Sequence, residues 1–423
     1  RLYCMRKRQP DQPDWYRLDN AAKIFPPTVH GADTAVFRLT CELTQPVEPA
    51  VLQGALDRTA EQYPNLRTVL RRGVFWYYLE QTERRARVVP EHAPPCAPLY
   101  EDSRSSLFEV SYWKNKINLD VFHVIADGAG AIELMQTLVN VYVAAAHDLA
   151  VRQPQRAALD ERMEDGFQKY YKSDARSTKA QKKRRAYRLP QRGKTLKVFE
   201  GVCSVRQALD AAHRYDATLT VYLAAALFEA IYGGMYVRDR KKPVVLTVPV
   251  DLRSYFPSHT ARNFFSIIRA SYAFDQESGA FSDILDSVAR AFKRELTAEN
   301  LAARLNSLAA LEHNFLLRPI PLFLKYPVLH VSGLISDAGE TAALSNIGKF
   351  QLPEEVGRYV KGFGVFVGTD ALQLCTCSYA DQLHLGFTTT MRDPAVIRRF
   401  FGRLTQDGIA LEVRSNTMYG EER

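Results

Sequence analysis

The stretch around residue 120 constrains the fold of this 423-residue chain more than any other. Apolar and polar residues alternate ahead of His123, which predicts a β-strand that ends with the imidazole on its apolar face. After Gly128, apolar residues recur at helical spacing and predict a helix with one buried face. The strand face comprises Ile117, Leu119 and Val121, and the helix face comprises Ile132, Met135, Leu138, Val139 and Tyr142. The segment should therefore hold a titratable ring at a defined place between a strand and a helix.

Strand and helix patterns alternate along the whole chain, which predicts the α/β class. At 423 residues, the chain exceeds the length that a single core usually organises, so two subdomains are expected. We place an N-terminal subdomain at 1–165, a basic linker at 166–195 and a C-terminal subdomain at 196–423.

The linker region carries most of the excess positive charge. Between 169 and 197 there are twelve Lys or Arg residues and one Asp, which gives +11 in a chain whose total is +9. Two interpretations stay open: a solvated connection, or a docking surface for an acidic partner. The residues in question are Lys182, Lys183, Arg184 and Arg185. A nucleic-acid partner is disfavoured, because no known nucleic-acid-binding module surrounds the patch.

Several classes of protein are disfavoured by the rest of the composition. No apolar run approaches the roughly 18 residues of a membrane span, and the charged N-terminus has no apolar stretch after it that would make a secretion signal. The six cysteines are scattered, so neither a disulfide framework nor a metal site is expected. These observations predict a cytoplasmic protein.

The spacing His123-x-x-x-Asp127-Gly128 resembles the motif of the CoA-dependent acyltransferase superfamily, and the chain looks most like its bacterial alcohol acetyltransferase-like and condensation-domain-like members. The resemblance implies two chloramphenicol acetyltransferase-like subdomains with mixed sheets and a tunnel between them. It also implies acyl transfer from acyl-CoA or acyl-phosphopantetheine, as co-substrate, to the hydroxyl or amine of a small molecule, with no bound cofactor. His123 would be the general base, a role that suits a group whose ordinary pKa lies near working pH.

Two later stretches are similar to the same superfamily. An apolar strand at 243–250 leads to Arg253, which the resemblance pairs with Asp127, and Asn263 follows ten residues later. In the stretch 341–348, Ser345 or Asn346 is placed where relatives donate a hydrogen bond near the thioester carbonyl. The sequence departs from two branches of the superfamily. Phe122 stands where condensation domains have a second histidine, and the Asp-Phe-Gly-Trp-Gly sequence of plant BAHD acyltransferases is absent.

Other interpretations of the same residues remain. His123 could be a hydrogen-bonded core residue and Asp127 an ordinary helix N-cap. The chain could also be a catalytically degenerate scaffold that binds a thioester or a carrier protein, or a hydrolase with a serine nucleophile. The joint occurrence of His123, Asp127, Gly128 and Arg253 disfavours the scaffold, and the absence of a Gly-x-Ser-x-Gly sequence disfavours the hydrolase.

Overall fold

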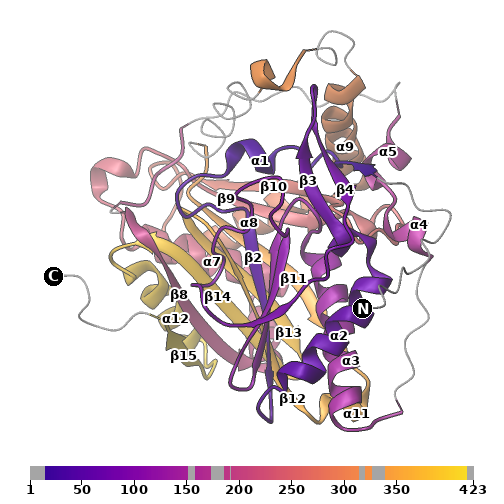
Figure 1. The fold of residues 1–423 in the computed structure, drawn as a ribbon. Coiled ribbons are helices and arrows are strands. Elements are labelled where there is room, and N and C mark those ends of the chain that lie inside the picture. The colour runs from indigo at the N-terminus through magenta and orange to yellow at the C-terminus, as the bar shows by residue number, and fades with distance from the viewer. Residues whose placement is uncertain are drawn as a thin grey trace, which may run out of the picture.

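The computed structural model describes residues 15–150, 158–172, 185–190, 192–313, 320–325 and 339–416. Its strands form three sheets, and helices pack on the two larger ones (Figure 1). Both larger sheets combine parallel and antiparallel pairs, so the predicted α/β class with mixed sheets is confirmed. The smallest sheet has the order β1-β4-β3, with β1 at Trp15–Arg17, β4 at Tyr77–Gln81 and β3 at Thr68–Arg72.

The five-stranded sheet, of order β12-β2-β7-β6-β5, carries the motif strand β7 at its centre. Helices α2 and α3 pack against each other beside this sheet. The strands are β2 (Val36–Leu43), β5 (Val88–Pro90), β6 (Phe108–Trp113), β7 (Lys116–Phe122) and β12 (Val360–Val367), and the helices are α2 (Pro49–Gln62) and α3 (Gly128–Ala146).

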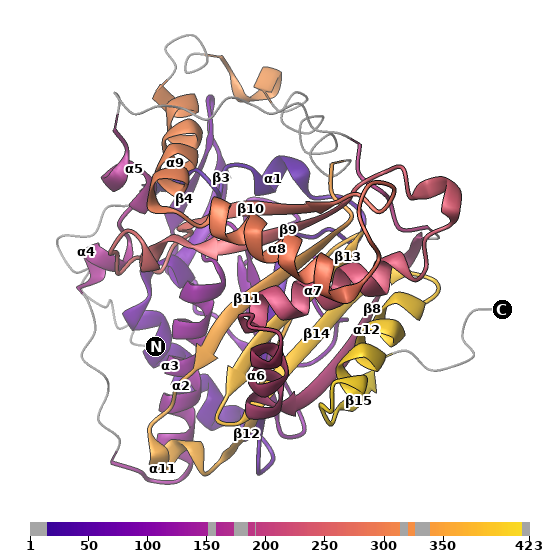
Figure 2. The same cartoon turned by 180° about the vertical axis from the view of Figure 1, so that it is seen from behind.

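The seven-stranded sheet has the order β10-β9-β11-β13-β14-β8-β15, and four helices cover one of its faces (Figure 2). The strands are β8 (Arg192–Ser204), β9 (Val244–Asp251), β10 (Phe265–Tyr272), β11 (Ala342–Phe350), β13 (Leu372–Tyr379), β14 (Gln382–Met391) and β15 (Glu412–Ser415). The covering helices are α6 (Val205–Arg214), α7 (Leu219–Tyr232), α8 (Phe281–Glu295) and α12 (Ala395–Gln406). Smaller elements are α1 (Phe25–Thr28), η1 (Pro64–Arg67), α4 (Leu159–Arg162), α5 (Gly166–Tyr170), η2 (Val237–Asp239), η3 (Leu252–Ser254), α9 (Ala298–His313) and α11 (Glu354–Gly357).

One strand of the five-stranded sheet comes from the far end of the chain. β12 pairs antiparallel with β2, so that Val365 lies opposite Leu39 and Phe363 opposite Cys41. These residues are buried together with Cys375 of β13, and this packing brings the two large sheets into contact. No local pattern in the sequence predicted this exchange, and the subdomain boundaries at 165 and 196 stay a prediction.

The motif strand is buried on both faces, although the sequence predicted burial of only one. Besides its apolar face, β7 carries Asp120, which is paired with Arg38 of β2 at 2.8 Å, both side chains being about 5% exposed. A buried carboxylate needs such a partner, because desolvation penalises its charge. This pair ties β7 to β2 a few residues before the histidine.

Helix α3 is long and apolar enough to pass the length and hydropathy criteria for a membrane span, although no such run was expected from the sequence. Two thirds of its apolar window is buried within the protein. Its buried residues include Leu134, Leu138 and Val139, which pack in the same core as β2 and β7. Such packing is typical of a core helix.

The basic linker is described only in part. Lys182, Lys183 and Arg184 lie outside the described residues, and Arg185 is exposed where the description resumes. Just after it, Tyr187 is buried and its N–H donates to the Pro243 carbonyl at 2.8 Å, which fastens this segment beside β9.

Candidate active site

His123 follows the last residue of β7, and three aromatic rings surround its imidazole. Its N–H donates to the Ala35 carbonyl at 2.8 Å, which fixes the backbone at the strand end. Phe25 of α1 stacks on the ring at 4.5 Å between centroids, and Phe37 and Phe265 contact it at 4.9 and 5.7 Å. Burial lowers the pKa of His123, against the opposing effect of its hydrogen bond to Asn263, so the imidazole is neutral at pH 7.

Asn263 determines which nitrogen of His123 carries the proton. Its Nδ2 donates to the His123 carbonyl at 2.9 Å and to Asp19 Oδ2 at 3.4 Å, so its Oδ1 is the atom that faces His123 Nδ1, at 3.1 Å. A reversed amide would point an oxygen at two other oxygens. His123 Nδ1 therefore donates, and Nε2, which has no hydrogen-bond partner among the described residues, keeps its lone pair.

Asp19 is a further member of this network that the sequence did not single out. It is fully buried, and burial raises the pKa of its carboxyl to about 6, against the opposing charge of Arg262. Its Oδ1 accepts from the Ala22 N–H at 2.7 Å, and Arg262 Nη2 lies 3.6 Å from its Oδ2. Asn263 was noted only for its spacing from Arg253, and no local signal distinguishes Asp19.

Asp127 and Arg253 form a bidentate ion pair, at 2.9 Å from Nη1 to Oδ2 and 3.2 Å from Nη2 to Oδ1. Asp127 also caps α3 by accepting from the Gly130 N–H at 3.0 Å, and it accepts from the Phe264 N–H at 2.8 Å. Burial opposes the charge of Arg253, but Asp127 and Asp251 outweigh it and hold the guanidinium pKa above its ordinary value. Both oxygens of the Asp127 carboxylate are therefore occupied, each by two hydrogen bonds from within the protein.

The same guanidinium holds the loop that carries Asn263. Arg253 Nη2 donates to the carbonyls of Thr260 and Arg262 at 3.0 and 2.6 Å. Because Asn263 is the next residue, the ion pair positions the amide that orients His123. Asp127 thus acts on the histidine through the backbone of the 260–263 loop, and its charge also raises the pKa of His123.

Gly128 and Gly130 allow the start of α3 to pack closely. A Cβ on Gly128 would lie 2.9 Å from Ile347 Cγ2, and one on Gly130 only 2.2 Å from the Ala261 carbonyl oxygen. The second contact is with backbone, which cannot move aside. Gly128 is thereby placed against β11, the strand that carries Ser345 and Asn346.

Ser345 and Asn346 differ in availability. Asn346 is exposed, and its side chain is engaged by Thr220 Oγ1 at 3.1 Å and by the Gly348 N–H at 3.2 Å. Ser345 is partly buried, and within the described part of the chain its hydroxyl makes no hydrogen bond. The Ser345 hydroxyl is therefore uncommitted, whereas the Asn346 amide is held in place by two hydrogen bonds and keeps one N–H for a ligand.

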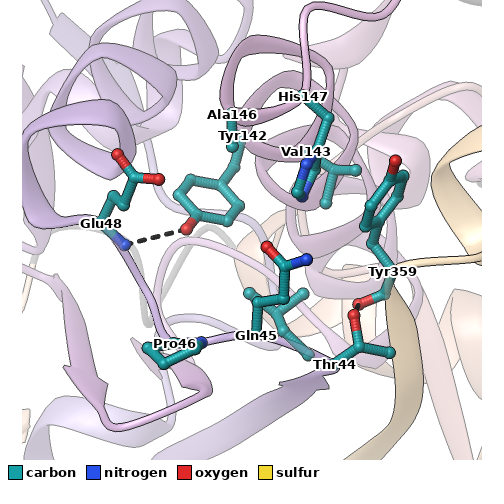
Figure 3. A pocket seen from close by; sticks show the side chains of 10 residues that line it. Thr44, Gln45, Pro46, Glu48, Tyr142, Val143, Ala146, His147 and Tyr359 are labelled. Atoms are coloured by element: carbon teal, nitrogen blue, oxygen red, sulfur yellow. Dashed lines mark hydrogen bonds between the residues drawn. The ribbon is translucent and has the colours of Figure 1, made fainter.

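One surface pocket lies apart from His123. It is lined by Tyr142, His147, Tyr359 and the loop that precedes α2 (Figure 3). The pocket lies at the last turn of α3, and a 19-residue helix is about 28 Å long, so the pocket is remote from the Asp127 end.

Over the described ranges, no group of three or more His, Cys, Asp or Glu side chains could hold a metal ion.

Searches by sequence find no match, either among family models or among curated proteins. By structure, the chain is similar to TRI101 of F. sporotrichioides complexed with coenzyme A and T-2, at 12% identity and a TM-score of 0.65, over 94% of this chain and 99% of that one. It is also similar to polyketide synthase associated protein 5 from Mycobacterium tuberculosis, at 16% identity and 0.58, over 92% and 96%.

A third similar structure is the starter condensation domain of rhizomide synthetase RzmA in complex with C8-CoA and Leu-SNAC, at 14% identity and a TM-score of 0.59, over 93% of each chain. At these identities the likeness establishes the fold. The expected architecture, that of acetyltransferases and condensation domains with two subdomains, is therefore confirmed.

Proposed function

We propose that this chain is an acyltransferase that moves an acyl group from a thioester to the hydroxyl or amine of a small molecule, with His123 as the general base. The observation that carries the proposal is the hydrogen bond from His123 Nδ1 to Asn263, which leaves an unprotonated Nε2 inside an aromatic enclosure. A neutral imidazole with one committed and one available nitrogen is suited to taking a proton from an acceptor.

In the proposed reaction, His123 Nε2 takes the acceptor's proton as the acceptor oxygen or nitrogen bonds to the thioester carbonyl carbon. The tetrahedral intermediate carries an oxyanion, for which the Ser345 hydroxyl is the proposed donor. The C–S bond then breaks, and the imidazolium returns its proton to the departing thiolate. Asn263 accepts from Nδ1 throughout, and the Asp127 carboxylate favours the transient positive charge.

Asp127, Arg253 and Gly128 have positioning roles in this proposal. The carboxylate is saturated by its own hydrogen bonds, so no proton passes through it. Its contribution is to hold the loop that carries Asn263 against the histidine. No covalent acyl-enzyme is required.

The donor would be acyl-CoA or an acyl carrier protein, and the basic linker is its proposed docking surface. Neutralising Lys182, Lys183, Arg184 and Arg185 together should weaken donor binding and flatten its dependence on salt, because exposed charges are screened over about 8 to 10 Å at physiological ionic strength. Turnover at saturating donor should not change. Equal affinity and an equal salt slope for the variant and the wild type would leave the linker as a connection only.

The test of the proposed function is thiol release from a panel of acyl-CoA thioesters, with and without small alcohols and amines. An acyltransferase releases thiol only when an acceptor is present. Release without an acceptor would identify a thioesterase. No release with any donor or acceptor, combined with thioester binding, would identify a degenerate scaffold.

A further inference from the structure

One end of the molecule carries an apolar surface built from three separate segments. The β3–β4 hairpin contributes Val74 and Phe75 at its tip, the residue before α1 contributes Ile24, and the helical turn 322–325 contributes Phe323 and Leu324. All five side chains are exposed, Val74 at 70% and Phe323 at 63%. We call this surface the tip patch.

The three segments are held together by specific contacts. The Leu322 N–H donates to the Val74 carbonyl at 2.8 Å, which joins the turn to the hairpin. The ammonium of Lys325 lies 4.2 Å from the centre of the Trp76 ring, and that of Lys23 lies 5.6 Å from it. The tip patch is therefore one assembled surface, with an indole at its base.

The turn at the tip has an unusual composition. The Gly73 N–H donates to the Trp76 carbonyl at 3.0 Å, so Val74 and Phe75 are the two central residues of a tight turn. Such turns favour Gly, Asn, Asp and Ser, because these residues suit both the backbone and the solvent. Large apolar side chains at the most exposed point of a hairpin indicate a surface that is covered in use.

The shape and charge of the tip patch indicate what covers it. The hairpin projects from the body of the protein beside the 322–325 turn (Figure 1, Figure 2). Lys23 lies over the Trp76 ring, and the exposed Arg72 stands two residues before Val74 in the sequence. The ranges 20–32, 65–79 and 320–325 contain no Asp or Glu. A projecting apolar tip with an indole and a basic rim is typical of insertion into the interface of an anionic bilayer.

We propose that the tip patch binds the surface of an anionic phospholipid bilayer, with Val74 and Phe75 inserted among the acyl chains. The binding itself does not depend on the proposed acyl transfer. It has a consequence for that reaction, because α1 carries Phe25 onto the His123 ring directly after Ile24 of the patch. A membrane-bound protein would therefore hold its histidine enclosure close to lipid-soluble substrates.

The experiment is sedimentation of the full chain with vesicles of phosphatidylcholine, with and without phosphatidylglycerol. We expect binding to the anionic vesicles that weakens with salt. The double variant Val74→Ser/Phe75→Ser should lose at least about tenfold in affinity, since burying one large apolar side chain exceeds the energy of a tenfold change. Lys23→Gln/Arg72→Gln should weaken binding and reduce its salt dependence.

The matched control is Tyr236→Ser/Val237→Ser at η2, which removes an even more exposed apolar pair from another part of the surface. This control should bind as the wild type does, and both serine variants should keep the wild-type melting temperature. Absence of vesicle binding by the wild type, or equal binding by the tip variant and the control, would overturn the proposal. The proposal would also be overturned if the wild type did not bind vesicles but self-associated in light scattering, and the tip variant did not. The tip patch would then be a contact between copies of the chain.

Discussion

Two histidines lie in very different environments: His123, partly exposed after β7, and His384, buried within β14. Their ring nitrogens are used differently. His123 Nδ1 is bonded to Asn263, whereas across the described residues neither nitrogen of His384 has a hydrogen-bond partner. Burial lowers the pKa of both rings, to about 3 for His384. Burial alone therefore yields only a neutral imidazole. A usable base also needs one nitrogen committed and the other accessible.

The surroundings of His384 leave no space for a ligand. Its ring meets Phe366 edge-on at 5.3 Å between centroids. A Cβ on Gly364 would lie 3.0 Å from its Nε2, and one on Gly386 would lie 2.8 Å from its Cε1. His384 is 5% exposed, whereas His123 remains partly exposed within its aromatic enclosure. We therefore assign His384 to packing between the two large sheets.

The largest expected effect is a loss of turnover when His123 is replaced, and no loss when His384 is replaced. His123→Ala should lower turnover by roughly 10²- to 10⁴-fold, the usual contribution of a general acid-base group. Thiol release with the best acceptor measures the loss, and circular dichroism checks that the variant is folded. Near-normal turnover in a folded variant would remove His123 from the mechanism, and an equal loss in His384→Leu would erase the distinction.

The next effect tests whether the Asp127–Arg253 pair acts through structure. Arg253→Ala leaves the buried Asp127 carboxylate without its counter-charge and should lower the free energy of unfolding by roughly 3 to 5 kcal/mol. Asp127→Ala should cost less, because Arg253 keeps its ion pair with Asp251 at 2.8 Å. The double substitution should cost less than the sum, because it removes both charges. Denaturant unfolding of the four proteins gives the coupling energy. Strict additivity would contradict the pairing, and stable variants that lost only turnover would move Asp127 into the chemistry.

A smaller effect concerns the bond that distinguishes His123 from His384. Asn263→Ala should lower kcat about tenfold to a hundredfold, since a hydrogen bond to a charged group contributes about 1.5 to 3 kcal/mol. The bond to Asn263 raises the pKa of His123, so its loss should shift the acid limb of the kcat/KM profile to lower pH. An unmoved limb would indicate that Asn263 only supports the fold.

The smallest effect at neutral pH belongs to His384. Its folded-state pKa of about 3 lies below the ordinary 6.5, so the unfolded chain binds the extra proton and stability is lost as pH falls from 6.5 towards 3. His384→Leu should leave turnover unchanged and should make the free energy of unfolding less sensitive to pH in that window. Denaturant unfolding at several pH values measures this. If the variant's free energy of unfolding depends on pH as steeply as that of the wild type, His384 is not the group that destabilises the fold at low pH.

Local pattern and resemblance predicted much of this architecture. The alternation before His123 and the helical spacing after Gly128 place β7 and α3 where the structure has them, and the resemblance links Arg253 to Asp127 across 126 residues. The amide of Asn263 could not be assigned in the same way, because its role depends on two residues far away in the sequence, His123 and Asp19. Asp19 is the extreme case, since an isolated Asp gives no sign that it is buried.

The exchange of β12 was missed for a related reason. A strand pattern predicts that a segment is extended and which face is buried, but not which edge it joins. Val360–Val367 pairs with β2 across more than 300 residues.

That exchanged strand also affects how the protein can be made. During synthesis, β2 emerges early, but the strand that covers its outer edge is translated only after residue 360, near the end of the chain. Until then, the nascent N-terminal half presents an open β-edge lined with apolar residues, which is the type of surface that other chains can pair with. Completion of the first sheet therefore awaits the last part of translation, and a protein truncated before residue 360 would keep that edge open permanently.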